Sequence, residues 1–178
     1  TLAYGGAIYA SLDAATAGLT VDASHYRDLI ALGREVKWAL NDSEHAVHPV
    51  DSRLSGVYGT ILYEDLGSAG GQVHQRNVTV FADGEVDRSP CGSGTCARLA
   101  VLADQGRVAP AGPTLRHESI VGSAFTGTVL VLVDARAGSP TENAVRRLVL
   151  GDGATRLVRI PPGVAHGVKN LAATRGRI

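Results

Sequence analysis

The segment from Asp87 to Thr95 holds the residues that are best suited to chemistry. Its order, Asp-Arg-Ser-Pro-Cys-Gly-Ser-Gly-Thr, places the thiol of Cys91 where a strand is expected to give way to a helix N-terminus. Backbone N–H groups of a first helical turn have no intrahelical acceptor and carry partial positive charge. Such a position lowers the pKa of a thiol and can hold a carboxylate. We therefore expect the Cys91 thiolate to form well below the ordinary pKa of about 8.5.

The neighbours of Cys91 suit a small amino-acid ligand. Gly92 and Gly94 remove side chains that would keep a ligand away from the N–H groups, and Asp87 could pair with a cationic amine. These parts match an α-amino acid, with donors for its carboxylate, an acid for its ammonium and a thiol beside its α-carbon. A buried cysteine is more often an inert small hydrophobe, and a glycine-rich turn often only makes the turn. A non-catalytic packing domain therefore stays open as an alternative.

The second cysteine, Cys96, is expected to pack in the core. It follows Cys91 by five positions, which in a helix places the two thiols on different faces, too far apart for a disulfide. Two cysteines are also too few for a disulfide scaffold. We expect no metal site, because no second histidine or acidic ligand stands at a suitable spacing from His166.

Strands and two helices must position the Cys91 segment. Residues 2–12 are predicted to form a strand, with a close backbone approach at Gly5-Gly6. Ser24 is expected to cap a helix that runs to about Leu40 and has an apolar stripe. A second helix should follow Cys91. Further strands are predicted at residues 57–63, 77–82 and near 86, and in HESIVGSAF, GTVLVLVDA, RRLVL and TRLVRI. The fold class that these elements indicate is α+β.

Composition bounds the classes of function. The chain has 178 residues, 17 basic and 17 acidic side chains and 44% hydrophobic residues, which suits about one ordinary domain. Zero net charge argues against binding to nucleic acid or to an anionic membrane. No apolar run approaches the roughly 18 residues of a membrane span. We expect a soluble, cytoplasmic domain. Because the sequence lacks methionine and begins with Thr1, we also expect a fragment or a processed chain.

Three segments resemble the proline racemase family, and they occur in the family's order. They are AYGGAIYASLDA, NVTVFADGEVDRSPCGSGTCARLAVL and HESIVGSAFTG, so the resemblance covers residues 1 to about 127. The family also contains 4-hydroxyproline 2-epimerases and trans-3-hydroxyproline dehydratases. The resemblance implies one lobe of a two-lobed fold similar to diaminopimelate epimerase, in which a curved sheet surrounds a central helix.

The resemblance also implies a mechanism. In the family, two acid/base residues, one per lobe, face opposite sides of the substrate α-carbon and invert it without a cofactor. By position Cys91 matches the base of the second lobe, Asp87 the substrate-binding aspartate, and Gly92 and Ser93 the carboxylate-binding turn. Ser93 stands where many relatives have Thr, a change that preserves the hydroxyl. Dehydratases of the family tend to carry Thr at the position of Cys91, so the cysteine favours a racemase or epimerase.

What the sequence lacks limits this expectation. The Cys-Gly-His motif of the family's first lobe does not occur in it, so we expect one base only. This chain alone should not racemise proline or hydroxyproline, and slow α-proton exchange without inversion is the most that one base could support. We leave open a homodimer.

Residues 128–178 resemble a different family, the dTDP-4-dehydrorhamnose 3,5-epimerases and related cupin-type sugar epimerases. The matching pieces are VDAR with GSPT, and IPPGVAHG. This resemblance implies a partial cupin-like β segment in which His166 faces a sugar-nucleotide pocket, although a histidine in a β turn is more often structural. We therefore expect domains at 1–127 and 128–178 in a chimeric sequence, with a nucleotide-sugar epimerase-like module as the alternative function.

Overall fold

The computed structural model describes residues 1–110, 112–133, 137–151 and 165–167 of the chain. Its strands are β1 Leu2–Tyr4, β2 Ile8–Asp13, β3 Val57–Ala69, β4 Gln72–Phe81, β5 Glu85–Asp87, β6 Thr114–Ser119, β7 Ala124–Val133, β8 Val145–Gly151 and β9 Ala165–Gly167. The two α-helices are α1 Tyr26–Asn41 and α2 Gly92–Asp104, and short 3-10 helices lie at Ala14–Ala17, Ala23–His25, Glu44–Ala46 and Ser52–Leu54. The predicted α+β class is confirmed.

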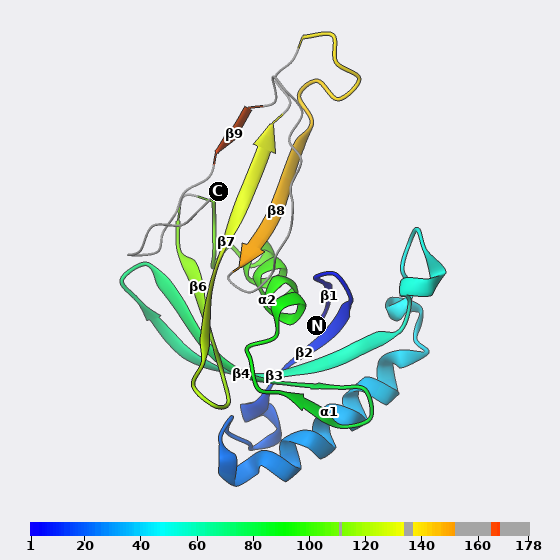
Figure 1. The fold of residues 1–178 in the computed structure, drawn as a ribbon, viewed down its shortest axis with the longest axis vertical. Coiled ribbons are helices and arrows are strands. Elements are labelled where there is room, and N and C mark those ends of the chain that lie inside the picture. The colour runs from blue at the N-terminus through cyan, green and yellow to red at the C-terminus, as the bar shows by residue number, and fades with distance from the viewer. Residues whose placement is uncertain (111, 134–136, 152–164, 168–178) are drawn as a thin grey trace.

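The strands form one sheet that curls around α2 (Figure 1). Its order is β1-β2-β3-β4-β6-β7-β8, with β5 paired to β4 and β9 paired to β7. The β2–β3 and β4–β6 pairs are parallel and the others are antiparallel. The curved sheet around a central helix is the arrangement that the resemblance implied for the first 127 residues.

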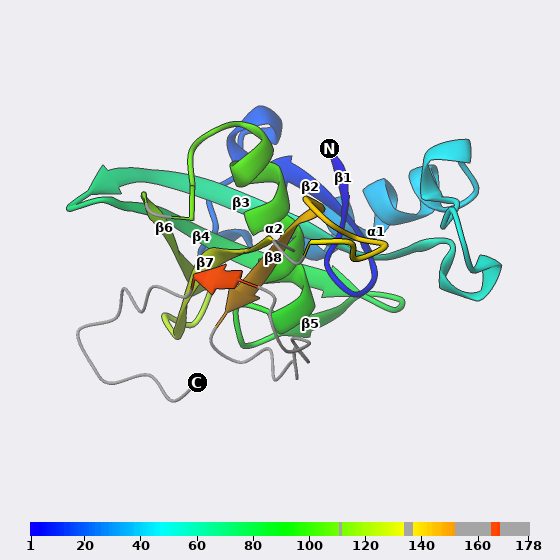
Figure 2. The same ribbon diagram turned by 90° about the horizontal axis from the view of Figure 1, so that it is seen from above.

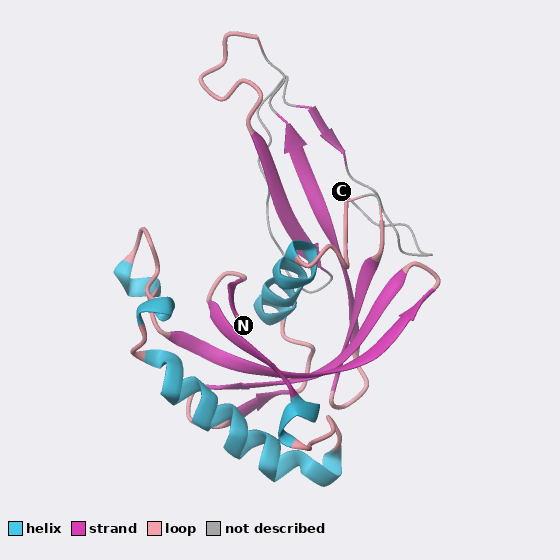
Figure 3. Ribbon diagram, turned by 180° about the vertical axis from the view of Figure 1, so that it is seen from behind, coloured by secondary structure: helices cyan, strands magenta, loops and turns pink. Residues whose placement is uncertain are grey.

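Helix α1 covers the convex side of the sheet, opposite α2 (Figures 2 and 3). It approaches β4 closely at Gly33, where a Cβ would lie 2.6 Å from the Cβ of Val80. The hydroxyl of Thr60 on β3 donates to the Gly33 carbonyl at 2.9 Å. A helix can lie this close to a sheet only where it has no side chain at the contact.

The predicted cap of this first helix is wrong. Ser24 lies inside a 3-10 turn, and α1 begins at Tyr26 without a side-chain cap. The carboxylate of Asp22 accepts from the Ser24 backbone N–H at 2.8 Å, so the acid two positions earlier caps the turn. Aspartate and serine are comparable as caps. Asp22 caps here because it is the extended residue directly before the 3-10 helix Ala23–His25.

Helix α2 fills the concave side. Leu99 and Leu102 are fully buried against Val73, Leu115 and Val129 from three strands. Strand β7 is held so close at Gly127 that a Cβ there would lie 2.2 Å from Leu99 Cδ1. Cys96 is 3% exposed, which confirms its expected place in the core.

The turn between β1 and β2 also packs on α2. A Cβ at Gly5 would lie 2.1 Å from the Ser93 carbonyl oxygen and 2.5 Å from the Ala97 nitrogen. The predicted close backbone approach is therefore confirmed at Gly5, and it is made to the first turns of α2. The single strand predicted over residues 2–12 is wrong, because the chain reverses at the glycine pair and forms the antiparallel strands β1 and β2.

Strand β4 changes its partner along one edge. It pairs with β6 over residues 72–77 and with β5 over residues 79–81. The chain that leaves β5 turns away from the sheet between these two partners and enters α2. This crossover places Cys91 at the middle of the curved sheet, on its concave side.

Strand β7 passes through the boundary predicted at residues 127 and 128. It pairs with β6 at Gly127 and with β8 at Val129. The two predicted domains therefore share one strand, and the division between them stays a prediction. The predicted strand TRLVRI lies outside the described residues. Neither helix in the described part of the chain is long and apolar enough to cross a bilayer.

Candidate active site

Cys91 occupies a strained turn immediately before α2. Its backbone φ is 66° and ψ is 114°, a conformation that residues other than glycine rarely adopt. Such a conformation costs about 1–3 kcal/mol and persists only where the surroundings impose it. Here the Cys91 carbonyl accepts from the Thr95 N–H at 2.8 Å, and the Cys91 N–H donates to Ser89 Oγ at 3.0 Å.

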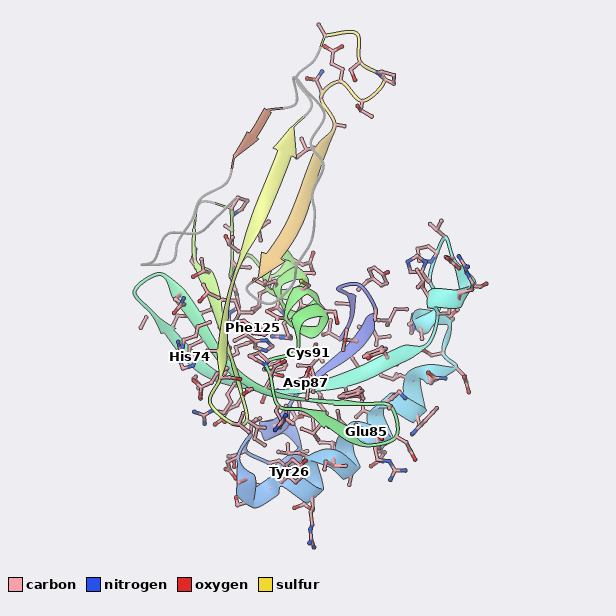
Figure 4. All side chains as sticks on the ribbon, in the orientation of Figure 1. Tyr26, His74, Glu85, Asp87, Cys91 and Phe125 are labelled. Atoms are coloured by element: carbon pink, nitrogen blue, oxygen red, sulfur yellow. The ribbon has the colours of Figure 1, made fainter. Side chains whose placement is uncertain are left out.

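Asp87 supports the same turn from the end of β5. Its carboxylate accepts from the Ser89 N–H at 2.8 Å, so Asp87, Ser89 and Cys91 form one chain of hydrogen bonds. Figure 4 shows Asp87 and Cys91 together in the middle of the curved sheet, whereas Tyr26 and Glu85 lie apart from them. The half-buried carboxylate is thus close enough for its charge to act on the thiol.

Buried polar side chains hold the peptide that precedes Cys91. The amide nitrogen of Asn77 donates to the Pro90 carbonyl at 3.4 Å and to the Glu118 carbonyl at 3.1 Å. The Thr95 hydroxyl donates to the same Pro90 oxygen at 3.2 Å. A strand, the helix and the turn are therefore tied together at one carbonyl.

His117 lies behind Thr95, with its Nδ1 2.8 Å from the Thr95 hydroxyl oxygen. The imidazole is fully buried, and its Nε2 has no hydrogen-bond partner within the described part of the chain. Burial, and secondly the charge of Arg98, lower the pKa of His117 to about 3. The ring is therefore neutral near pH 7 and acts as a hydrogen-bonding support for Thr95.

Arg98 is a second buried polar group on α2. Its Nε and Nη2 donate to the side-chain oxygen of Gln75 at 3.2 and 3.0 Å, and its guanidinium lies 3.9 Å from the ring centroid of Tyr63. Burial lowers the pKa of the Arg98 guanidinium. A buried cation needs such partners, which here fix the helix to β3 and β4.

The Cys91 thiol itself faces two hydroxyl groups. Tyr9 Oη lies 3.5 Å from Cys91 Sγ and 2.7 Å from Ser93 Oγ, and either atom of each pair could be the donor. The packing around the sulfur is tight, because a Cβ at Gly94 would lie 3.1 Å from Sγ. Glycine at this position is thus needed for the observed place of the thiol.

The expected low pKa of Cys91 is wrong for this structure. The residue is only 7% exposed, and burial raises the pKa of its thiol. Hydrogen bonds from Tyr9, from the Gly94 N–H and from Ser93 oppose this rise, while the charge of Asp87 adds to it. The helix N-terminus does act on the thiol as predicted, but its effect is smaller than the cost of removing the thiolate from water.

The four residues predicted for the site lie on one short segment. Asp87 ends β5, Cys91 forms the turn, and Gly92 and Ser93 open α2, both half-buried. Their roles toward a substrate stay predictions. His166 lies on β9, where its Cα pairs with Leu132, and its side chain is outside the described part.

Sequence reasoning did not single out Tyr9, Asn77, Thr95 or His117. All four fall within the three segments that carried the resemblance, which was the available signal. Among the described residues, no three histidine, cysteine or acidic side chains lie together as metal ligands would.

Comparison with known proteins gives one family. The sequence model described as "Proline racemase" matches residues 1–155. The chain is 48% identical over 129 residues to a trans-3-hydroxy-L-proline dehydratase of Burkholderia cenocepacia. It is 46% identical, also over 129 residues, to a 3-hydroxyproline 2-epimerase of Burkholderia multivorans. Each match covers 72% of this chain and 38% of the relative, so the chain spans about two fifths of the length of these relatives.

Solved structures agree with the sequence matches. A hydroxyproline epimerase from Agrobacterium vitis, crystallised with trans-4-hydroxy-L-proline, has a TM-score of 0.63 at 34% identity, over 84% of this chain and 40% of that one. A probable proline racemase from Agrobacterium radiobacter, crystallised with carbonate, has a TM-score of 0.62 at 28% identity, over 90% of this chain and 46% of that one.

Proposed function

Because this chain belongs to the proline racemase family, we propose that its site removes or returns the α-proton of proline or a hydroxyproline, with Cys91 as the base. The observation that carries the proposal is the Cys91 thiol in the turn before α2, with Asp87 hydrogen-bonded to the same turn.

The substrate would be held by its two charged groups. The Gly94 N–H interacts with the thiol, which leaves the N–H groups of Gly92 and Ser93 as the donors for a carboxylate. Asp87 would pair with the cationic ring nitrogen. These two contacts on either side of the thiol would bring the α-carbon, which lies between carboxylate and nitrogen, next to Cys91 Sγ.

The reaction begins with the thiolate taking the α-proton. The electron pair left on carbon delocalises into the carboxylate, which is stabilised by the helix N-terminus. Inversion then needs a proton from a second acid on the opposite face. We propose that this chain supplies one of the two groups, so that alone it exchanges the α-proton and does not invert the centre.

A second candidate reaction is dehydration of a 3-hydroxyproline. It is favoured by the similarity to a trans-3-hydroxy-L-proline dehydratase. It starts with the same proton transfer, because the hydroxyl on the neighbouring carbon leaves once the α-carbon carries the electron pair. The cysteine at position 91 favours racemisation or epimerisation over this reaction.

The test is α-proton exchange in D2O. The purified chain is incubated with L-proline, trans-4-hydroxy-L-proline and trans-3-hydroxy-L-proline, and NMR follows the α-proton while polarimetry follows inversion. We expect slow exchange with one of the three, no inversion, and no exchange by the Cys91→Ser variant. Equal exchange by wild type and Cys91→Ser would refute the role of Cys91. Enzyme-dependent inversion would show that the chain supplies both groups.

Loss of water from trans-3-hydroxy-L-proline alone would favour the dehydratase. The Cys96→Ser variant is the matched control, because Cys96 is buried in the core of the same helix. It should exchange the α-proton as wild type does.

A further inference from the structure

The hydroxyl of Tyr9 lies within hydrogen-bonding distance of two side chains of the candidate site, Cys91 and Ser93. Tyr9 comes from β2, more than eighty residues before Cys91 in sequence, and its side chain is fully buried. Its hydroxyl is 3.5 Å from Cys91 Sγ and 2.7 Å from Ser93 Oγ. A hydroxyl has one proton to donate, so it can donate to only one of these two atoms at a time.

The ring of Tyr9 is held in place by apolar contacts. It packs with Ile61, Cys91 and Ala97 in one buried cluster, and the ring of Tyr58 meets its edge at a centroid distance of 5.6 Å. The hydroxyl therefore cannot leave the sulfur without moving the core, whereas its proton can rotate about the C–O bond.

The direction of the hydrogen bonds must depend on the state of Cys91. A thiol can donate to Tyr9 Oη, while Tyr9 donates to Ser93. A thiolate can only accept, so Tyr9 can turn its proton to the sulfur. Ser93 can then donate its own proton to Tyr9 Oη or directly to the sulfur. The proton of Tyr9 stays on Tyr9 throughout. The proton of Cys91 is the one that leaves for, or returns from, solvent or the substrate carbon.

We propose that Tyr9 and Ser93 form a reversible hydrogen-bond relay that stabilises the Cys91 thiolate, with Tyr9 as its positioning residue. The relay deepens the function proposed above, because it would let a buried thiol serve as a base. Burial is the main obstacle to a thiolate here, and chained hydrogen bonds to an anion are stronger than isolated ones.

The charges around the sulfur agree with this role. Burial raises the pKa of Tyr9 well above its usual range, so the phenol keeps its proton and is a donor. Asp87 on β5 is the charged group that acts against the thiolate, and Tyr58 on β3 acts on the relay only through Tyr9. With an acid opposing the thiolate, its stabilisation must come from the hydroxyls and the Gly94 N–H.

The test is a titration of the thiol that needs no substrate. The chain has two cysteines, so ¹³Cβ-labelled cysteine gives two NMR signals, and Cys91→Ser assigns them. The Cβ shift reports thiol against thiolate as pH is raised. In Tyr9→Phe, which keeps the ring, we expect the midpoint to rise by about one to two pH units, or about 10- to 100-fold less thiolate at a given pH.

Three further variants separate the relay from packing. Tyr58→Phe is the matched control and should leave the midpoint unchanged, because its hydroxyl is not part of the relay. Ser93→Ala should raise the midpoint by less than Tyr9→Phe does. Ser93→Thr, which keeps the hydroxyl, should restore the wild-type midpoint.

An unchanged midpoint in Tyr9→Phe, or an equal rise in Tyr58→Phe, would overturn the relay. If Tyr9→Phe does not fold, the comparison of Ser93→Ala with Ser93→Thr decides, and equal midpoints in that pair would overturn it. The titration is independent of turnover. A chain with the expected midpoints but no α-proton exchange would therefore contradict the proposed function and leave the relay intact.

Discussion

Gly5 and Ser93 are in backbone contact, although they lie in different elements and 88 positions apart in the chain. A Cβ on Gly5 would be 2.1 Å from the Ser93 carbonyl oxygen. The turn between β1 and β2 therefore determines how far the first turn of α2, and with it the Cys91 segment, can enter the concave side of the sheet.

Gly5→Ala should consequently destabilise the protein and disturb the site together. The added methyl meets backbone atoms of α2, which cannot rotate away, so we expect a loss of about 2–3 kcal/mol in unfolding free energy and a changed Cys91 ¹³Cβ shift. Gly127→Ala is the comparison, because its methyl would meet the end of the Leu99 side chain. It should cost less and leave the Cys91 signal in place. Urea unfolding measures both, and a larger loss in Gly127→Ala would contradict this interpretation.

His117 should make stability depend on pH below about 6.5. The unfolded chain binds a proton to this imidazole below about pH 6.5, whereas the folded chain binds it only near pH 3. Stability from this group is therefore complete above pH 6.5 and falls by about 1.4 kcal/mol per pH unit below it. Between pH 6.5 and 5 the loss should reach about 2 kcal/mol.

The variant His117→Gln tests this assignment, since it removes the titrating group and keeps a hydrogen-bonding side chain. Unfolding free energy measured in urea at several pH values should fall less steeply in His117→Gln than in wild type. The exposed residue His45 provides the control, and His45→Gln should keep the wild-type slope. Identical slopes in all three proteins would show that His117 is not the cause.

Asn77→Ala should loosen the turn that carries Cys91. The variant removes a buried donor that serves the Pro90 and Glu118 carbonyls, so we expect about 1–3 kcal/mol of lost stability. Gln72→Ala, on the same strand, removes one half-buried hydrogen bond to the Thr114 hydroxyl and should cost under about 1 kcal/mol. Chemical denaturation compares the two, and equal losses would mean that the Asn77 contacts add nothing beyond a single bond.

Limited proteolysis should cut first in the exposed connection between β7 and β8, residues 137–144. Strand β7 should resist, because β6 pairs with its residues 124–127 and β8 pairs with its residues 127–133, so the strand is paired before and after the predicted boundary. A protease of broad specificity, with mass spectrometry of the first fragments, checks this. First cleavage within residues 124–133 would instead support two separable units that meet near residue 127.

The sequence alone located the candidate site. A strand, Pro90, a glycine-rich turn and a helix with apolar spacing are local signals, and each depends on residues within a few positions of Cys91. The close approach at Gly5 was also predictable from the glycine pair, although the pair lies in the turn between β1 and β2 and not inside a strand as the sequence suggested. The cap at the start of the α1 region was not predictable, since Asp22 and Ser24 are both residue types that cap helices. The backbone conformation decides that Asp22 caps the 3-10 turn before α1.

What only the tertiary structure decided is the environment of the thiol. Its direction of pKa change depends on burial, and burial is set by Tyr9, Ile61 and Ala97, which come from two strands and the helix. The pairing of Tyr9 with Cys91 joins segments brought together by the curl of the sheet. A sequence pattern reflects the conformational preferences of residues that are close in the chain. The desolvation and hydrogen bonding of the Cys91 thiol instead depend on neighbours that are distant in the chain and that only folding brings together.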